Sequence, residues 1–81
     1  SDPNGVTAIT EAAEFFAQGV NLDRAATLME LFESLGSTNT TAWKAAARTY
    51  VLLGDSAHAE RAAACYGAGG VQVPDDCGSR G

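Results

Sequence analysis

The sequence predicts an all-α protein of two antiparallel helix-turn-helix repeats, stacked as in an α–α solenoid, with a loose C-terminal tail. Apolar residues recur at steps of three and four in four separate segments, which is typical of helices. Glycine and a following capping residue separate the segments of each pair. The two halves are related by a period of 34–35 residues. We therefore expect a first repeat at 3–36, a second at 37–68 and a flexible tail at 69–81.

The first helix is expected at about 3–18. Asp2 and Pro3 form a plausible N-cap and first-turn pair. Gly19 is expected to end the helix in the left-handed conformation. The apolar face consists of Val6, Ile9, Ala13 and Phe16.

The second helix is expected at about 21–35, with Asn21 as its cap and Gly36 as its end. Its apolar face consists of Leu22, Ala25, Ala26, Met29, Phe32 and Leu35. Leu28 and Leu31 widen this face. A helix with so wide an apolar face is expected to be covered on more than one side.

The second hairpin is expected to join helices at about 41–53 and 55–66, with Gly54 between them. Asp55 and Ser56 are both suitable caps for its second helix. The inward faces consist of Trp43, Ala46, Ala47, Tyr50 and Leu53, then Ala59, Ala62, Ala63 and Tyr66. The helix should fail at 67–70, where three of four residues are glycine.

The spacing within these hairpins resembles the tetratricopeptide repeat. That family carries Trp, a small residue and Tyr on the first helix, Gly-Asp in the turn and Ala early in the second helix. The matching residues here are Trp43, Ala47, Tyr50, Gly54, Asp55 and Ala59. The first half matches more weakly through Ala12, Phe16, Gly19 and Ala25, and the closing aromatic–Ala–Pro pattern of the family is displaced by about three residues. This resemblance implies a protein-interaction or assembly module.

A second resemblance is to the pentatricopeptide repeat, through "LMELFESLG" at 28–36 and "GVQVPDD" at 70–76. This family binds single-stranded RNA in organelles. The resemblance implies base-reading positions at Thr10 and Lys44, with the partner positions near Thr40 and Asp75. Arg48, one turn after Lys44, would add to a basic stripe, although Glu30 and Glu33 are candidate ion-pair partners for both cations.

Composition favours a protein partner over RNA. Ten acidic and five basic residues give a net charge of −5, which repels phosphate. Two hairpins leave ends that neighbouring repeats or another protein would cover. The apolar residues lying off the main inward faces are the candidates for that contact: Leu28, Leu31, Val51 and Leu52. The alternative is that they fill the core between the hairpins.

Catalytic chemistry finds little support, and we expect neither an enzyme nor a cofactor. Asp55, Ser56 and His58 are expected to cap a helix and to point in different directions. His58 and Cys65 lie two helical turns apart, ~10 Å along a helix axis, too far for a nucleophile and its base. One histidine and no Cys-x-x-Cys leave a zinc site without ligands.

The chain's surroundings are only partly constrained. Cys65 and Cys77 are interpreted first as reduced thiols of an intracellular protein, in the cytoplasm or an organelle. The alternative is a disulfide that ties the tail to the last helix. No apolar run approaches the ~18–20 residues of a membrane span. The start "SDPNGV" lacks methionine, which indicates a processed or truncated N-terminus.

Overall fold

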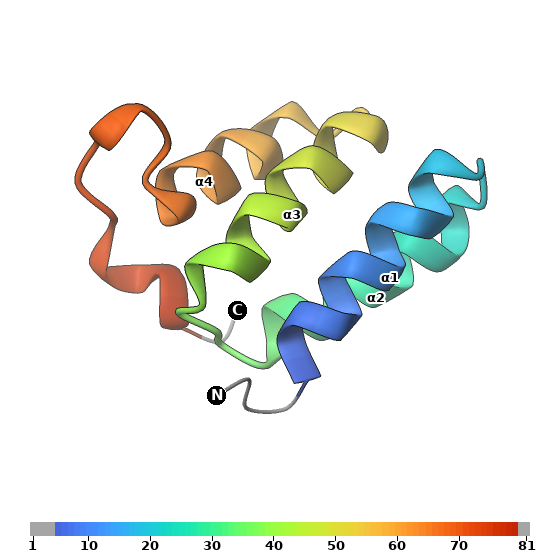
Figure 1. Cartoon of the computed structure of the whole chain (residues 1–81), viewed down its shortest axis with the longest axis horizontal. Coiled ribbons are helices and arrows are strands. Elements are labelled where there is room, and N and C mark those ends of the chain that lie inside the picture. Colours follow the sequence, from blue (N-terminus) through green and yellow to red (C-terminus); the bar gives the residue numbers. More distant parts are fainter. Residues whose placement is uncertain (1–4, 80–81) are drawn as a thin grey trace.

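Four α-helices make up most of the chain in a computed structural model that describes residues 5–79 (Figure 1). The helices are α1 (Val6–Gln18), α2 (Leu22–Ser34), α3 (Thr40–Leu52) and α4 (Ser56–Tyr66), followed by two short 3₁₀ turns, η2 (Ala68–Gly70) and η3 (Asp75–Gly78). The described residues contain no β-strand. The predicted all-α class is therefore confirmed.

The helices form two antiparallel hairpins that pack through their first helices. α1 packs on α2, and α3 packs on α4. α1 also packs along α3, so the two hairpins lie next to each other with α1 and α3 in parallel (Figure 1). The tail leaves the end of α4 and returns towards the start of α3.

Side-chain caps fix three of the four helix starts. Asn21 accepts a hydrogen bond from the backbone N–H of Arg24, and Asp55 accepts one from that of His58, as expected. Asn39 caps α3, which begins one residue before its expected start. The predicted start of α1 near Pro3 is wrong, because the helix begins at Val6 after a left-handed Gly5. The expected cap, Asp2, lies outside the described residues.

The turn between α1 and α2 differs from its prediction by one residue. Gly19 has an ordinary φ of −84°, and Val20 takes the left-handed conformation with φ 66°. Gly54 has φ 73° in the second turn, as expected. A β-branched residue in this region is strained, so the first turn carries its strain at Val20.

The two turns have the same backbone hydrogen bonds at equivalent positions of the two hairpins. The N–H of Asn21 donates to the carbonyl of Phe16 (2.8 Å), and the N–H of Asp55 donates to the carbonyl of Tyr50 (3.0 Å). Asn21 and Asp55 are 34 residues apart in the sequence. The first residues of α1 and α3 are separated by the same distance, and so are their last residues. By this spacing, Val20 is the counterpart of Gly54, and Gly19 is not.

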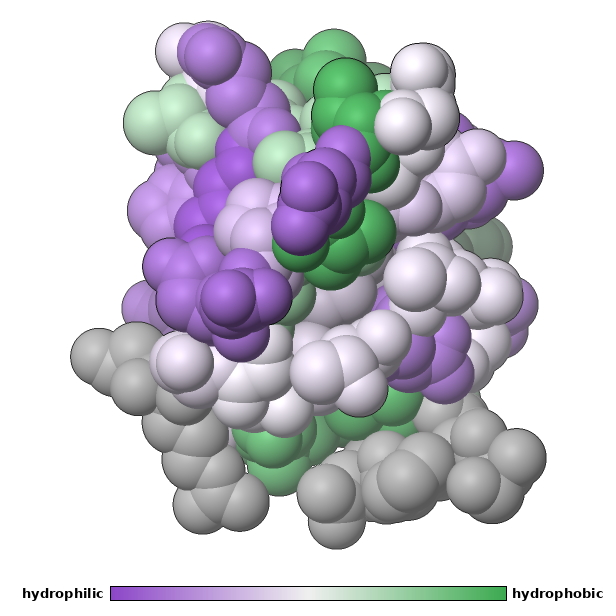
Figure 2. All heavy atoms as spheres, turned by 90° about the vertical axis from the view of Figure 1, so that its left-hand side faces the viewer, coloured by the Kyte–Doolittle hydropathy of each residue, from purple (hydrophilic) through white to green (hydrophobic). Residues whose placement is uncertain are grey.

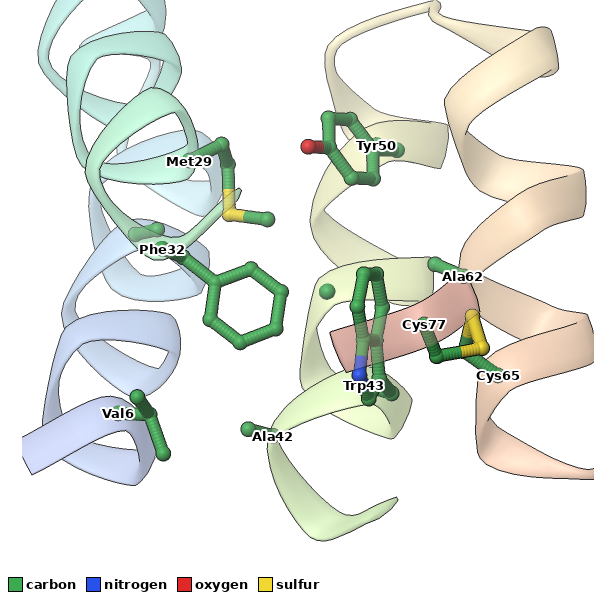
Figure 3. Packing of buried hydrophobic residues seen from close by; sticks show 11 residues of the cluster. Val6, Met29, Phe32, Ala42, Trp43, Tyr50, Ala62, Cys65 and Cys77 are labelled. Atoms are coloured by element: carbon green, nitrogen blue, oxygen red, sulfur yellow. A yellow bond between two sulfur atoms is a disulfide. The ribbon is translucent and has the colours of Figure 1, made fainter. Parts of the chain in front are cut away.

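Trp43 is the centre of the core, and only 1% of its surface is exposed. Its ring meets the ring of Phe32 from α2 edge to face, with centroids 4.7 Å apart (Figure 3). The guanidinium of Arg61 from α4 lies 5.5 Å from the Trp43 ring centroid. The indole N–H donates to the carbonyl of Ser37 in the linker (2.8 Å). One side chain thus connects both hairpins and the loop between them.

The tail contains no α-helix and is fixed to the second hairpin near its end. Cys65 and Cys77 form a disulfide, so the interpretation as two reduced thiols is wrong and the alternative pairing is the one observed. Arg61 donates to the carboxylate and the carbonyl of Asp76 (both 3.3 Å). Cys77 is buried beside Trp43 (Figure 3).

Relieving the strain at Val20 should stabilise the protein. A left-handed β-branched residue costs ~1–2 kcal/mol, and glycine avoids this at a smaller entropic cost. Val20→Gly should therefore raise the free energy of unfolding by about 0.5–1 kcal/mol, measured by urea denaturation. The reciprocal variant Gly54→Val should lower it by ~1–2 kcal/mol; nothing lies within 4 Å of a Cβ built there, so only the backbone is affected. Equal stability of both variants would contradict the assigned turn.

Breaking the disulfide should destabilise the fold. A cross-link that closes a loop of this length contributes ~3 kcal/mol. Cys65→Ala/Cys77→Ala should show a lower melting temperature than the oxidised chain. Reduction of the wild type should lower it similarly and leave the double variant unaffected. A melting temperature that is insensitive to reduction would contradict the pairing.

Candidate binding groove

A hollow of about 470 Å³ lies between the two hairpins. It is bounded by α2 on one side and by the end of α3 and the start of α4 on the other. Phe32 of α2 contacts Trp43 of α3, and Glu33 of α2 accepts a hydrogen bond from Tyr50 of α3. In Figure 3, Met29 and Tyr50 project into the hollow from opposite sides. The lining consists of Ala26, Met29, Glu30, Glu33, Ser34, Tyr50, Leu53, Asp55 and His58.

Tyr50 forms the floor of this groove and is 5% exposed, in agreement with its predicted core position. Its hydroxyl donates to Glu33 Oε2 (2.8 Å). Burial, and then the hydrogen bond to the negatively charged Glu33, raise the pKa of Tyr50 well above its ordinary value. The phenol therefore stays protonated, holds Glu33 in place and is a poor nucleophile.

Asp55 and His58 form the rim at the start of α4. One carboxylate oxygen of Asp55 accepts from the His58 backbone N–H (3.1 Å), and the other lies 2.7 Å from His58 Nδ1. The imidazole stacks on the Tyr50 ring with centroids 4.9 Å apart. The expectation that Asp55 and His58 point apart is therefore wrong, because the cap brings the two side chains together.

This Asp–His pair has no activated nucleophile in the described part of the chain. Cys65 is held in the disulfide, and residues 5–79 contain no free thiol. The hydroxyl of Tyr50 donates to Glu33, and that of Ser34 donates to the carbonyl of Leu31 (2.7 Å). The groove therefore has an apolar floor, and charged side chains lie along its edge.

That charge is mainly negative. Glu30, Glu33 and Asp55 contribute three carboxylates to the lining, and His58 is the one basic side chain among them. The floor consists of Ala26, Met29, Tyr50 and Leu53. An apolar floor under an acidic edge suits a ligand that is apolar and cationic.

The four predicted partner-binding residues have different environments. Leu28 is partly buried and packs against the core, as in the alternative interpretation. Leu31, Val51 and Leu52 are exposed, Val51 by 68%. None of the four lines the groove. Their role in binding a partner remains a prediction.

The residues implied for RNA binding differ in their exposure. Thr10 is buried, and its hydroxyl donates to the carbonyls of Val6 and Thr7, so a base cannot reach it. Lys44 is exposed, with its ammonium 5.5 Å from the Tyr66 ring centroid. Asp75 is exposed in η3.

Arg48 has a different partner from the one expected. Its guanidinium donates to both carboxylate oxygens of Glu14 on α1 (2.8 and 3.0 Å). This bond raises the pKa of Arg48 further above its ordinary value. The predicted pairing of Lys44 and Arg48 with Glu30 and Glu33 is thus wrong, and Glu33 binds Tyr50 instead.

The sequence pointed to several residues of the groove but not to the groove itself. Glu30 and Glu33 were expected to pair with cations of α3, and Tyr50 was expected in the core. A tyrosine at a core position two turns after a tryptophan was the available signal, because a buried hydroxyl requires a partner. The partner's identity depends on the angle between the hairpins.

A second hollow of about 380 Å³ at the start of α2 is lined by polar side chains: Asn21, Asp23, Arg24 and Thr27. On the face that carries α4 and the tail, hydrophobic residues are separated by white and purple ones (Figure 2). Residues 5–79 contain no group of three or more side chains placed to hold a metal ion. None of the described helices has the length and apolar character needed to cross a membrane.

Comparisons with protein-family models, with curated proteins and with solved structures find no match for this chain. The two family resemblances therefore remain proposals.

The buried phenol should make stability depend on pH in the alkaline range. The pKa of Tyr50 is higher in the folded than in the unfolded chain. The phenol therefore makes its full contribution to stability below pH ~10, and this contribution is lost progressively as the pH rises above that value. The free energy of unfolding should fall there by up to ~1.4 kcal/mol per pH unit from this group.

Tyr50→Phe should show a smaller alkaline decrease, measured by denaturant unfolding at several pH values. Tyr66→Phe tests whether the loss of any tyrosine has the same effect. An unchanged alkaline decrease in Tyr50→Phe would contradict the role assigned to the hydroxyl.

Proposed function

We propose that this protein is a non-enzymatic protein-interaction or assembly module whose groove binds a segment of another protein with adjacent apolar and basic side chains. The observation that carries the proposal is the combination of an apolar, aromatic floor with three carboxylates at its edge. The hollow, about 470 Å³, lies within the range of ligand pockets, ~300–1,000 Å³. It has room for a few side chains of such a segment.

Each part of the groove has a separate task in this proposal. An aliphatic or aromatic side chain of the partner packs between Met29 and Tyr50 and is removed from water. A neighbouring Arg or Lys reaches Glu30, which is exposed on α2. Glu33 is already oriented by Tyr50 and offers its second carboxylate oxygen at no further conformational cost.

The resemblance to tetratricopeptide repeats is part of this proposal. It is supported by the equivalent turn hydrogen bonds of the two hairpins and by the packing of α1 on α3. The RNA-binding alternative draws no support from the groove, because carboxylates repel phosphate.

The disulfide argues against a reducing compartment for this protein. Disulfides persist mainly in oxidising surroundings. The pairing of Cys65 with Cys77 therefore favours an oxidising compartment over the cytoplasm that the sequence first indicated.

A display library of random peptides, selected on the oxidised chain, tests the proposal. Selected peptides should contain Arg or Lys within a few positions of a large apolar residue. Glu30→Gln should weaken the binding of a selected peptide about two- to fivefold, as expected for one exposed charge pair. Replacing the basic residue of the peptide by Gln should remove the difference between the wild type and Glu30→Gln.

Glu60→Gln is the matched control, since Glu60 is exposed on α4 and does not line the groove. This variant should bind the peptide as the wild type does. Three results would overturn the proposal: peptides without basic residues, equal weakening by both variants, or salt-sensitive binding of oligouridine in place of the peptides.

A further inference from the structure

Three positions that are buried in α3 are exposed at the corresponding positions of α1. Ala42, Ala45 and Thr49 are buried. Their counterparts in the first hairpin, Ala8, Glu11 and Phe15, are exposed, Phe15 by 70%. Because the two hairpins have the same form, the difference arises from a neighbour that α3 has and α1 lacks. That neighbour is α1 itself, which packs along α3.

The converse holds for the other side of the same contact. Val6, Thr10 and Ala17 are buried in α1. Their counterparts in the second hairpin, Thr40, Lys44 and Val51, are exposed on α3. Within the chain, α1 and α3 pack on each other through one side of each helix. The equivalent opposite sides, one on α1 and one on α3, are exposed. We call these exposed sides the α1 face (Ala8, Glu11, Phe15) and the α3 face (Thr40, Lys44, Val51).

The contact between α1 and α3 also defines how the two helices are aligned. Arg48, the ninth residue of α3, forms its ion pair with Glu14, the ninth residue of α1. Near the start of the helices, the side-chain amide of Asn39 donates to the hydroxyl of Thr7 (3.4 Å). α1 and α3 therefore lie parallel and in register, and a contact of the same type would keep this register.

We propose that a second copy of this chain covers these faces, with the α1 face of one copy stacked on the α3 face of the next. In that register Lys44 of one copy takes the place of Thr10, and Glu11 of the other takes the place of Ala45. A positive and a negative side chain thus meet at one level of the stack. Phe15 and Val51 provide the apolar part of the contact one to two turns further on.

Complementarity between the two faces is the reason for choosing a second copy as the occupant. The α3 face carries a cation and the α1 face carries an anion at matching levels, so each face attracts the other and repels itself. The contact joins two different surfaces, and the copies therefore form an open row instead of a closed pair.

Tyr66 extends the α3 face onto α4. Its counterpart in the first hairpin is Phe32, which is buried against Trp43 of the following hairpin. Tyr66 is 36% exposed and lies under the ammonium of Lys44, which it holds at this surface. The neighbouring copy would cover the ring of Tyr66 as Trp43 covers that of Phe32.

Sedimentation of the oxidised chain from low micromolar to millimolar concentration tests this inference. The average mass of the wild type should rise with concentration. Lys44→Glu and Glu11→Lys should each weaken association at least about fivefold, because each variant brings like charges together. Helical circular dichroism should be unchanged, since both residues are exposed.

Charge exchange separates this contact from a general effect of charge. Lys44→Glu/Glu11→Lys in one chain should associate as the wild type does, and so should an equal mixture of the two single variants. Arg24→Glu and Glu60→Lys, at exposed positions outside both faces, should associate normally. A wild type that stays monomeric at millimolar concentration, or failure of the double variant to recover, would overturn the inference. Neither face contributes to the groove, so peptide binding is tested independently.

Discussion

The structure depends on the burial of one indole ring. Trp43 contacts α2 through Phe32, α4 through Arg61 and the linker through its N–H bond to Ser37. Arg61 in turn holds Asp76, and the disulfide places Cys77 against the same core. A chain of 81 residues buries too little apolar surface for a large stability margin, so these contacts at one residue join parts that would otherwise be weakly connected.

The same ring explains why the hairpins enclose a groove. Two large aromatic side chains, Phe32 and Trp43, fill the space between α2 and α3 at one level. Two turns further along α3, Tyr50 faces Met29 of α2. These two side chains line the space between the helices but do not fill it. The hydroxyl of Tyr50 needs an acceptor at this depth and finds Glu33, which draws a carboxylate to the groove. Core packing and the acidic character of the groove are therefore linked.

Local signals in the sequence were sufficient for the helices and most of their ends. Periodic apolar residues located all four helices, and Asn21 and Asp55 are capping residues whose role depends only on their neighbours. Predictions failed where two conformations compete locally, as at Gly19 and Val20. They also failed where partners come from distant segments. The bond of Arg48 to Glu14 and that of Tyr50 to Glu33 depend on how the hairpins pack, which periodicity does not specify.

The Lys and Arg side chains within residues 5–79 are all engaged outside the groove. Residues 5–79 contain four Lys and Arg side chains. Arg48 and Arg61 are bonded to Glu14 and Asp76, while Arg24 and Lys44 lie over the rings of Phe16 and Tyr66. None of the four lines the groove, where His58 is the one basic side chain beside the carboxylates. Carboxylates at the open edge of the groove are hydrated. The guanidinium of a bound partner would replace this water with a bidentate hydrogen bond. That bond is stronger than the bond to water where the apolar floor excludes solvent.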